Sequence, residues 1–336
     1  MKGRILQKLK ENAPGFVSGA RLSKMLGVSR TSVWKYVLEL KKEGYVIESF
    51  TKKGYRLISV PDLLNLNELV YNLRTKKIGS SIQYIDLIDS TNTYAKKLAL
   101  DGCPEGTVIV AGRQTNGKGR MGRNWDSANK SGIWMSIVLR PDILPEQAQI
   151  ITLAVSVAVV KAIESLFGLK CGIKWPNDVI LNGKKVCGIL TEMGCETDRI
   201  NYIVVGIGVN VNQDEDDFAV ELKDKATSIK MSMIKENMIN GDMDINRSEL
   251  IKQVLFEMEK LYENICRLKV REILDEWKKY SVTIGNEVKV VCRGIEYKGF
   301  AKDITEDGGL LVNCDDGASR KVLSGEISLR GTMGYI

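Results

Sequence analysis

Histidine is absent from this chain of 336 residues. Its absence excludes Ser-His-Asp catalysis and metal sites built on imidazole. The seven cysteines include no C-x-x-C pair, so the sequence indicates neither a disulfide framework nor a zinc site. We therefore expect no metal held by a cluster of side chains, and a reduced, cytoplasmic compartment fits this use of cysteine.

Long apolar runs are also scarce. We find no stretch that reaches the ~18 apolar residues needed to span a membrane, and residues 1–10 lack the apolar core of a signal peptide. We therefore expect no contact with a membrane. The length, with 44% hydrophobic and 27% charged residues, is typical of two or three globular domains.

Positive charge is concentrated at the start of the chain. Residues 1–60 hold 13 lysines and arginines against four glutamates and no aspartate, whereas the rest of the chain is slightly acidic. This asymmetry predicts a module that binds a polyanion, with a merely solvated basic surface as the alternative.

The pattern within this basic segment is that of a helix-turn-helix. Residues 18–26 predict a short helix, and Gly27 predicts a tight turn. Ser29 can cap a second helix, in which Val33 and Val37 share one apolar face. After this helix, the run 45–58 predicts a β-hairpin with a basic tip, which is the wing of a winged helix.

The second helix and the wing carry the residues expected to contact DNA. Near base edges or phosphates we expect Arg30, Thr31, Ser32, Lys35, Lys52 and Lys53. Trp34 is assigned to the core rather than to this contact. Winged helices also bind proteins, but the local charge favours DNA.

A glycine-rich basic loop is the strongest chemical signal. The β-branched run Thr107–Ala111 leads into residues 112–123, which contain four glycines and four cations. Such a loop suits an anion, because its amides can approach closely while arginine and lysine supply charge. It matches most of a P-loop, but Gly119 stands where a Ser or Thr should hold magnesium. We expect an anionic-ligand loop of another kind, with a plain flexible loop as the alternative.

Other polar residues interrupt the apolar strands of the centre. Residues 89–92 can cap a helix, or they can offer short polar groups to a ligand. Pro176 must break a strand and turn Asn177 and Asp178 toward a site. Lys185 follows a predicted Asn-Gly hairpin turn, where a solvated lysine is the simpler interpretation.

Five motifs stand in one order along the chain. They are Asp89-Ser-Thr-Asn92, Gln114 with Gly117-Lys-Gly-Arg-Met-Gly-Arg123, Lys174-Trp-Pro-Asn-Asp178, Lys185-Val-Cys-Gly-Ile-Leu190 and Gly206-Ile-Gly-Val-Asn210. In this order and spacing the chain resembles biotin protein ligases. With a winged helix in front, it resembles the bifunctional type that is also the biotin operon repressor. The loop departs from the family pattern, with Lys118 and Met121 in place of two arginines.

The resemblance implies a fold and a division into domains. The fold class is α+β, with an N-terminal winged helix-turn-helix at 1–62 and a central mixed-sheet ligase domain at 63–280. A connecting helix would occupy 63–77. The short strands of the tail imply a small SH3-like β-barrel at 281–336.

The resemblance also implies roles for individual residues. Biotin binding would fall to Ser90, Thr91, Asn92, Gln114, Lys118, Gly119, Arg120, Lys185, Gly188, Gly206 and Gly208. ATP and the adenylate would be bound by Arg120, Arg123, Trp125, Lys185 and Asn210. The catalytic residues would be Lys185, Arg120 and Asp178, the last by orienting the incoming amine.

The implied activity has two steps and a regulatory use. Biotin and ATP, with Mg²⁺, would give biotinyl-5′-AMP, and the biotinyl group would pass to one lysine of a biotin carboxyl carrier protein. Biotinyl-5′-AMP would also act as corepressor of a ligand-promoted homodimer that binds operator DNA. The alternatives are a lipoate or octanoate ligase of related fold and a non-catalytic biotin-sensing repressor.

Overall fold

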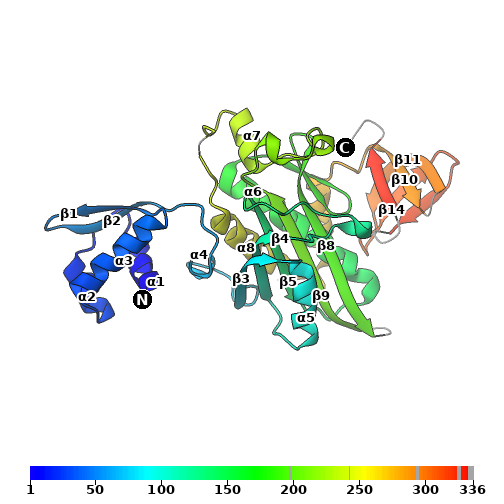
Figure 1. Ribbon diagram of the computed structural model, residues 1–336. Helices are drawn as coiled ribbons and strands as arrows, with labels where there is room; N and C mark the ends of the chain where they lie inside the picture. The colour runs from blue at the N-terminus through cyan, green and yellow to red at the C-terminus, as the bar shows by residue number, and fades with distance from the viewer. Residues whose placement is uncertain (197–198, 242, 293–294, 324–326, 332–336) are drawn as a thin grey trace. The chain divides into compact units, whose positions relative to one another are not determined.

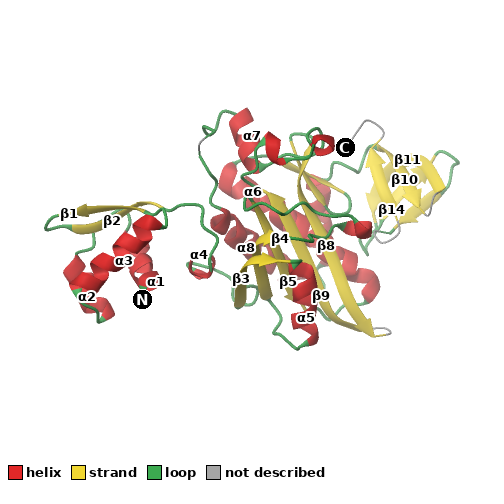
Figure 2. Ribbon diagram, viewed as in Figure 1, coloured by secondary structure: helices red, strands yellow, loops and turns green. Residues whose placement is uncertain are grey.

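The computed structural model describes residues 1–196, 199–241, 243–292, 295–323 and 327–331. The chain divides into two compact units, Met1–Asn72 and Leu73–Ile336, each of which is described by itself (Figures 1 and 2).

The first unit is a winged helix-turn-helix. Its elements are α1 (Lys2–Asn12), α2 (Gly19–Leu26), α3 (Arg30–Lys42), β1 (Val46–Phe50), β2 (Gly54–Ser59) and α4 (Leu66–Val70). The side chain of Ser18 caps α2 and that of Ser29 caps α3. Gly27 ends α2 with φ +65°, as the tight turn requires. The predicted roles of Gly27 as a tight turn and of Ser29 as a cap are therefore confirmed.

The segment after the wing folds back onto this unit. The carboxylate of Glu68 in α4 is buried, accepts a hydrogen bond from the hydroxyl of Tyr45 at 2.6 Å and pairs with Lys10. The connecting helix predicted over 63–77 is helical only at Leu66–Val70. The boundary between compact units also falls ten residues later than the predicted 62, because Glu68 ties α4 to the winged helix.

The second unit is built on a mixed seven-stranded sheet of order β3-β4-β5-β9-β8-β7-β6. The strands are β3 (Ser81–Ile88), β4 (Thr107–Gln114), β5 (Gly132–Leu139), β6 (Cys171–Lys174), β7 (Asp178–Leu181), β8 (Lys184–Glu196) and β9 (Arg199–Asn210). Within the described part of this sheet, β3 and β4 are the one parallel pair of neighbouring strands. This arrangement confirms the predicted α+β class.

Helices cover both faces of the sheet. The helices are α5 (Thr91–Leu100), α6 (Ala148–Phe167), α7 (Ile229–Lys235), α8 (Arg247–Cys266) and α9 (Val270–Tyr280). Glu192 of β8 pairs with Lys96 of α5 at 2.7 Å, whereas its neighbour Thr191 lies 2.8 Å from Thr152 of α6. Because successive strand residues point to opposite faces, α5 and α6 lie on opposite sides of the sheet (Figure 1).

The expectation that no segment could span a membrane needs correction. The helical stretch Pro145–Phe167 is long and apolar enough to do so by length and composition. However, 72% of its most apolar window is buried inside the protein, as expected of a core helix packed on α8 and α9.

The tail forms an antiparallel five-stranded sheet of order β13-β12-β11-β10-β14. Its strands are β10 (Glu287–Cys292), β11 (Ile295–Ile304), β12 (Leu310–Cys314), β13 (Ser319–Val322) and β14 (Ile327–Gly331). The indole of Trp175 donates to the carbonyl of Gly308 at 3.0 Å, and the backbone N–H of Trp175 donates to Thr283 Oγ1 at 2.9 Å. The tail is thereby attached beside the Trp-Pro-Asn-Asp motif.

Candidate active site

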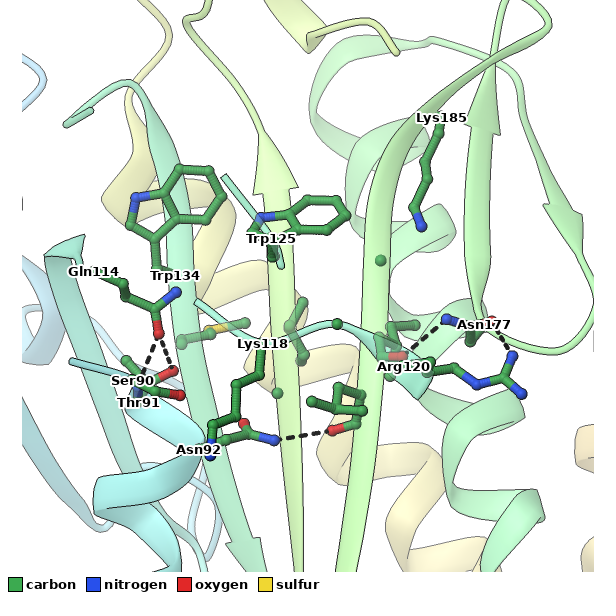
Figure 3. Close-up of a pocket in the computed structure, with 18 residues that line it drawn as sticks. Ser90, Thr91, Asn92, Gln114, Lys118, Arg120, Trp125, Trp134, Asn177 and Lys185 are labelled. Atoms are coloured by element: carbon green, nitrogen blue, oxygen red, sulfur yellow. Dashed lines mark hydrogen bonds between the residues drawn. The ribbon is translucent and has the colours of Figure 1, made fainter. Parts of the chain in front are cut away.

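A narrow cavity lies where the glycine-rich loop crosses the sheet, near the N-terminus of α5 (Figure 3). Its volume is about 50 Å³. The residues around it are Ser90, Thr91, Asn92, Gln114, Lys118, Gly119, Arg120, Trp125, Trp134, Met135, Asn177, Lys185, Gly188, Ile189, Leu190, Gly206, Ile207 and Gly208. Every residue predicted to bind biotin is among them, although they come from five separate segments of the chain.

The N-terminus of α5 forms one end of the cavity. Ser90 caps the helix by accepting from the N–H of Thr93 at 3.5 Å, so the simpler of its two interpretations is correct. It is also buried in the cavity wall, as the second interpretation requires. Thr91 donates to Gln114 Oε1 from its backbone N–H at 2.8 Å and from its hydroxyl at 3.1 Å.

Ser136 is a buried residue that the sequence interpretation missed. Its hydroxyl lies 2.8 Å from Thr91 Oγ1 and 2.6 Å from Asn92 Oδ1. At the other end of the network, the amide nitrogen of Gln114 donates to Ser127 Oγ at 3.0 Å. The hydrogen bonds fix the amide of Gln114 with its oxygen toward Thr91 and its nitrogen toward Ser127. A serine inside an apolar strand gives no sequence signal that distinguishes it from a core residue.

Three glycines form the floor of the cavity. A Cβ on Gly206 would lie 2.2 Å from Asn92 Oδ1. On Gly188 and Gly208 it would lie 2.7 and 2.6 Å from the indole of Trp125. All three distances are shorter than real Cβ contacts, so these positions require glycine for the close approach of side chains. The assignment of the same three glycines to biotin stays a prediction.

The indole of Trp125 therefore rests on β8 and β9, at two of the glycines that were predicted to bind biotin. The centroid of its ring lies 6.5 Å from the centroid of the Trp134 ring and 5.1 Å from Nζ of Lys185. Its Nε1 is buried without a hydrogen-bond acceptor in the described part of the chain. A buried donor without an acceptor is costly, so this ring can gain by moving against a ligand that accepts its hydrogen bond.

The basic loop bends back on itself at its tip. The N–H of Gly119 donates to the carbonyl of Arg123 at 2.7 Å, and Gly122 has φ +72°. Met121 also has positive φ, +57°, which glycine or asparagine tolerates better than a long side chain. The guanidinium of Arg120 points inward and donates to Asn177 Oδ1 at 2.7 Å. Burial lowers the pKa of Arg120 although Asp178 opposes the shift, so its charge is poorly solvated.

Lys185 is not the solvated hairpin lysine that its position alone suggested. It follows the turn at Asn182 and Gly183, which has the two positive φ values expected of an Asn-Gly hairpin. Its ammonium lies 2.7 Å from Asp178 Oδ1, and only 22% of its side chain is exposed. Pro176 was expected to cause a break or bulge, and the chain makes a hairpin turn there, since Lys174 pairs with Asp178.

A larger cavity of about 560 Å³ adjoins the narrow one. Both cavities share Gly119, Arg120, Trp125, Asn177 and Lys185. The larger cavity is also lined by Arg123 and Asn210, so all residues predicted to bind ATP border it. The segment from Gln213 to Ala226, which the sequence analysis had not assigned, supplies further walls: Gln213, Asp217, Phe218, Leu222, Lys225 and Ala226.

The charges around the junction of the two cavities suit two anions held side by side. Arg120 and Lys185 border both spaces, Lys118 borders the narrow one and Arg123 the larger one. Hydrogen-bond donors with fixed positions near developing negative charge are what acyl and phosphoryl transfer require.

Comparisons with known proteins agree with this geometry. The sequence matches the HTH domain family over residues 3–56, the Biotin/lipoate A/B protein ligase family over 84–210 and the Biotin protein ligase C terminal domain over 283–330. It is 41% identical over 325 residues to the Bifunctional ligase/repressor BirA of Bacillus spizizenii, with 97% of each chain covered. The chain belongs to the biotin protein ligase family.

Further relatives support the same membership. The Bifunctional ligase/repressor BirA of Escherichia coli is 30% identical, over 94% of this chain and 93% of that protein. Among solved structures, the biotin protein ligase from Aquifex aeolicus in complex with biotin and ATP matches with a TM-score of 0.62 and 30% identity, covering 75% of this chain and 100% of that one. The resemblance to the bifunctional ligase and repressor type is thus confirmed.

The winged helix of this biotin protein ligase presents most of its predicted DNA contacts to solvent. Arg30, Thr31 and Lys35 on α3 and Lys52 and Lys53 at the wing tip are exposed. Ser32 is half-buried, and its hydroxyl lies 2.9 Å from that of the capping Ser29. The assignment of Trp34 to the core is wrong, because 51% of this residue is exposed.

Proposed function

We propose that this biotin protein ligase condenses biotin with ATP in the paired cavities and then transfers the biotinyl group to one lysine of a biotin carboxyl carrier protein. The narrow cavity takes the bicyclic ring and tail of biotin, and the larger one takes the nucleotide. The observation that carries the proposal is the position of Lys185 and Arg120, which border both cavities. Cations at this junction reduce the repulsion between a carboxylate and a triphosphate.

Adenylation follows from this placement. A carboxylate oxygen of biotin attacks the α-phosphorus of ATP, the bond to the β-phosphate oxygen breaks, and pyrophosphate leaves with the electron pair. Lys185 stabilises the charge on the phosphoryl oxygens, while Lys118 and Arg120 close over the ligand. Entry of the tail along Gly188 and Gly208 requires the indole of Trp125 to move toward the larger cavity, where it stacks on adenine beside Asn210.

Transfer of the biotinyl group to the carrier lysine uses the carboxylate of Asp178, which lies beside Lys185. The amine of the carrier lysine attacks the acyl carbon, the acyl–phosphate bond breaks, and AMP leaves. Asp178 lies 2.7 Å from Lys185, where it can orient that amine and accept its proton.

Magnesium would enter with ATP and neutralise part of the phosphate charge. No cluster of three or more Cys, Asp or Glu side chains suited to a metal occurs among the residues that the structure describes. The larger cavity is bordered by the separate carboxylates of Asp126, Asp178 and Asp217. One or two carboxylates together with substrate phosphates fit the usual way in which magnesium is held in such sites.

The same adenylate would act as corepressor. Biotinyl-5′-AMP would order the basic loop, the ordered loop would complete a homodimer surface, and two winged helices would become spaced for a palindromic operator of biotin synthesis or transport genes. This sequence of events would take place in the cytoplasm, where carrier protein consumes the adenylate. Operator affinity measured with and without biotin plus ATP tests it. Equal affinities would mean that biotinyl-5′-AMP does not control DNA binding by the winged helix.

The two alternative functions are separable by experiment. The family that matches residues 84–210 includes lipoate ligases, so labelled biotin, lipoate and octanoate should be offered in competition with ATP. We expect acyl-AMP from biotin alone. Formation from lipoate or octanoate in preference would overturn the substrate assignment, and binding of biotin without any adenylate would favour the non-catalytic sensor.

A further inference from the structure

The recognition helix α3 presents a tryptophan to solvent. Val33, Val37 and Leu40 form its buried face, with at most 1% exposure. Trp34 and Leu38, one turn apart on another face, are 51% and 37% exposed. A large aromatic side chain normally gains by burial, so a position outside the core suggests a partner.

The fold of the winged helix does not need this indole. The core cluster of the unit is formed by residues of α1, α2, α3 and the wing, and Trp34 is not part of it. Within the described residues its ring has no hydrogen bond, ring contact or cation–π contact, although Phe16 and Phe50 near the wing make a ring pair at 5.2 Å. Its role is therefore not explained by stability.

The surroundings of the indole are basic. Arg30 and Thr31 lie one turn earlier on the helix and Lys35 follows directly, all exposed. Residues 1–60 hold 13 basic against four acidic side chains. An apolar ring between cations matches a surface that combines negative phosphates with apolar groups, which is the major groove of duplex DNA with its thymine methyl groups.

We propose that the indole of Trp34 enters the major groove of the operator and packs against the 5-methyl group of a thymine. The inference rests on the proposed repressor function and adds a determinant of sequence specificity to it. Arg30 and Lys35 supply hydrogen bonds and charge beside the ring, whereas Trp34 reads an apolar group that neither cation can recognise.

The test uses duplexes selected from a random-sequence library by the full-length protein in the presence of biotin, ATP and Mg²⁺. Each thymine of the selected site is replaced in turn by deoxyuridine, which removes only the methyl group. The parent should lose affinity at one or two of these positions. Trp34→Ala should weaken binding to the thymine duplex on the order of tenfold. At the positions where the parent is sensitive to deoxyuridine, the variant should bind the thymine and uracil duplexes with the same affinity.

Two controls separate this contact from others. Trp34→Phe, which keeps an apolar ring, should retain part of the methyl dependence. Lys52→Ala, a substitution at the wing tip, should weaken all duplexes alike and reduce the salt dependence of binding, which Trp34→Ala should leave unchanged. Adenylation of biotin should be the same in all three variants.

Three results would overturn the inference while sparing the repressor function. Trp34→Ala could bind as well as the parent, it could lose the same affinity on thymine and uracil duplexes, or it could change the oligomeric state of the protein instead of DNA binding. If the parent selects no duplex with biotin and ATP, the repressor function itself fails, and the inference fails with it.

Discussion

The ammonium of Lys185 lies 2.7 Å from Asp178 Oδ1, at the junction of two cavities. The pair brings a cation and a possible proton acceptor to the same point. We propose that the two reaction steps use them in turn.

Separate substitutions should therefore affect separate steps. Lys185→Ala should lower the rate of adenylation about 10²- to 10³-fold, because the charge that faces the phosphoryl oxygens is lost. Asp178→Asn should mainly slow transfer from preformed biotinyl-5′-AMP to carrier protein. Pyrophosphate release and carrier biotinylation measure the two steps. Equal effects of both substitutions on both steps would contradict the division of labour.

Ser136 should act as a positioning residue for biotin. Ser136→Ala removes the hydroxyl that holds Thr91 and Asn92, so KM for biotin should rise about tenfold while kcat changes little. Ser156→Ala is the matched control, because this buried hydroxyl donates to the carbonyl of Leu153 within α6. A similar rise in KM in the control would mean that Ser136 acts through general stability.

Gly208 tests the floor of the cavity. In Gly208→Ala the new Cβ would meet Trp125 Nε1 at 2.6 Å, so the indole must shift. We expect a loss of about 1–3 kcal/mol in unfolding free energy and weaker binding of biotinyl-5′-AMP by calorimetry. Gly241→Ala is the control, since among the described residues beyond its chain neighbours an added Cβ would meet no heavy atom within 4 Å. Unchanged binding of biotinyl-5′-AMP by Gly208→Ala would mean that β9 does not contact the ligand at this position.

Met121 replaces an arginine of the family pattern and has φ +57°. Met121→Arg adds a cation to the exposed loop tip, so biotinyl-5′-AMP should dissociate more slowly, and the difference should shrink at high salt. Met121→Gly should stabilise the bent loop by about 1 kcal/mol without that salt effect. Identical off-rates for the parent and Met121→Arg would exclude a role for the missing charge.

The lowered pKa of Glu192 predicts that the stability of the protein depends on pH. Burial opposes ionisation, yet hydrogen bonds from Lys96 and Asn92 hold the pKa of Glu192 below its usual 4.5. A lowered folded-state pKa stabilises the protein above the unfolded value, and this stability is lost as pH falls through the folded value. Unfolding free energy of the parent should therefore fall by at most about 1 kcal/mol more than that of Glu192→Gln below pH ~4.5. The same change of unfolding free energy with pH in the parent and in Glu192→Gln, measured by denaturant titration, would contradict this.

Much of the fold could be read from local patterns. The strands at residues 107–114 and 132–139 and helix Ala148–Phe167 follow from runs of apolar residues, and the turn at Asn182 follows from backbone preferences. These features depend on near neighbours in sequence. The shortened helix at Leu66–Val70 was missed because the buried contact of Glu68 with the winged helix is a tertiary one.

Site residues that belong to sequence motifs could be predicted. Site residues whose position depends on the register between neighbouring strands could not. The residues assigned from motifs line the cavities, but their roles remain predictions. Ser136 faces Thr91 only because β5 lies beside β9 and under α5, which no spacing along the chain reveals. Trp34 was placed in the core because its residue type is usually buried. Spacing alone favoured a solvated Lys185, because a lysine after a hairpin turn is usually solvated, and only the resemblance assigned it to the site.

The most direct test of the account is mass spectrometry after incubation of the protein with biotin, Mg²⁺ and ATP. We expect biotinyl-5′-AMP from the parent and none above background from Lys185→Ala over the same time. The absence of the adenylate from the parent, or an equal amount from Lys185→Ala, would contradict the claim that cations at the junction of the two cavities join biotin to ATP.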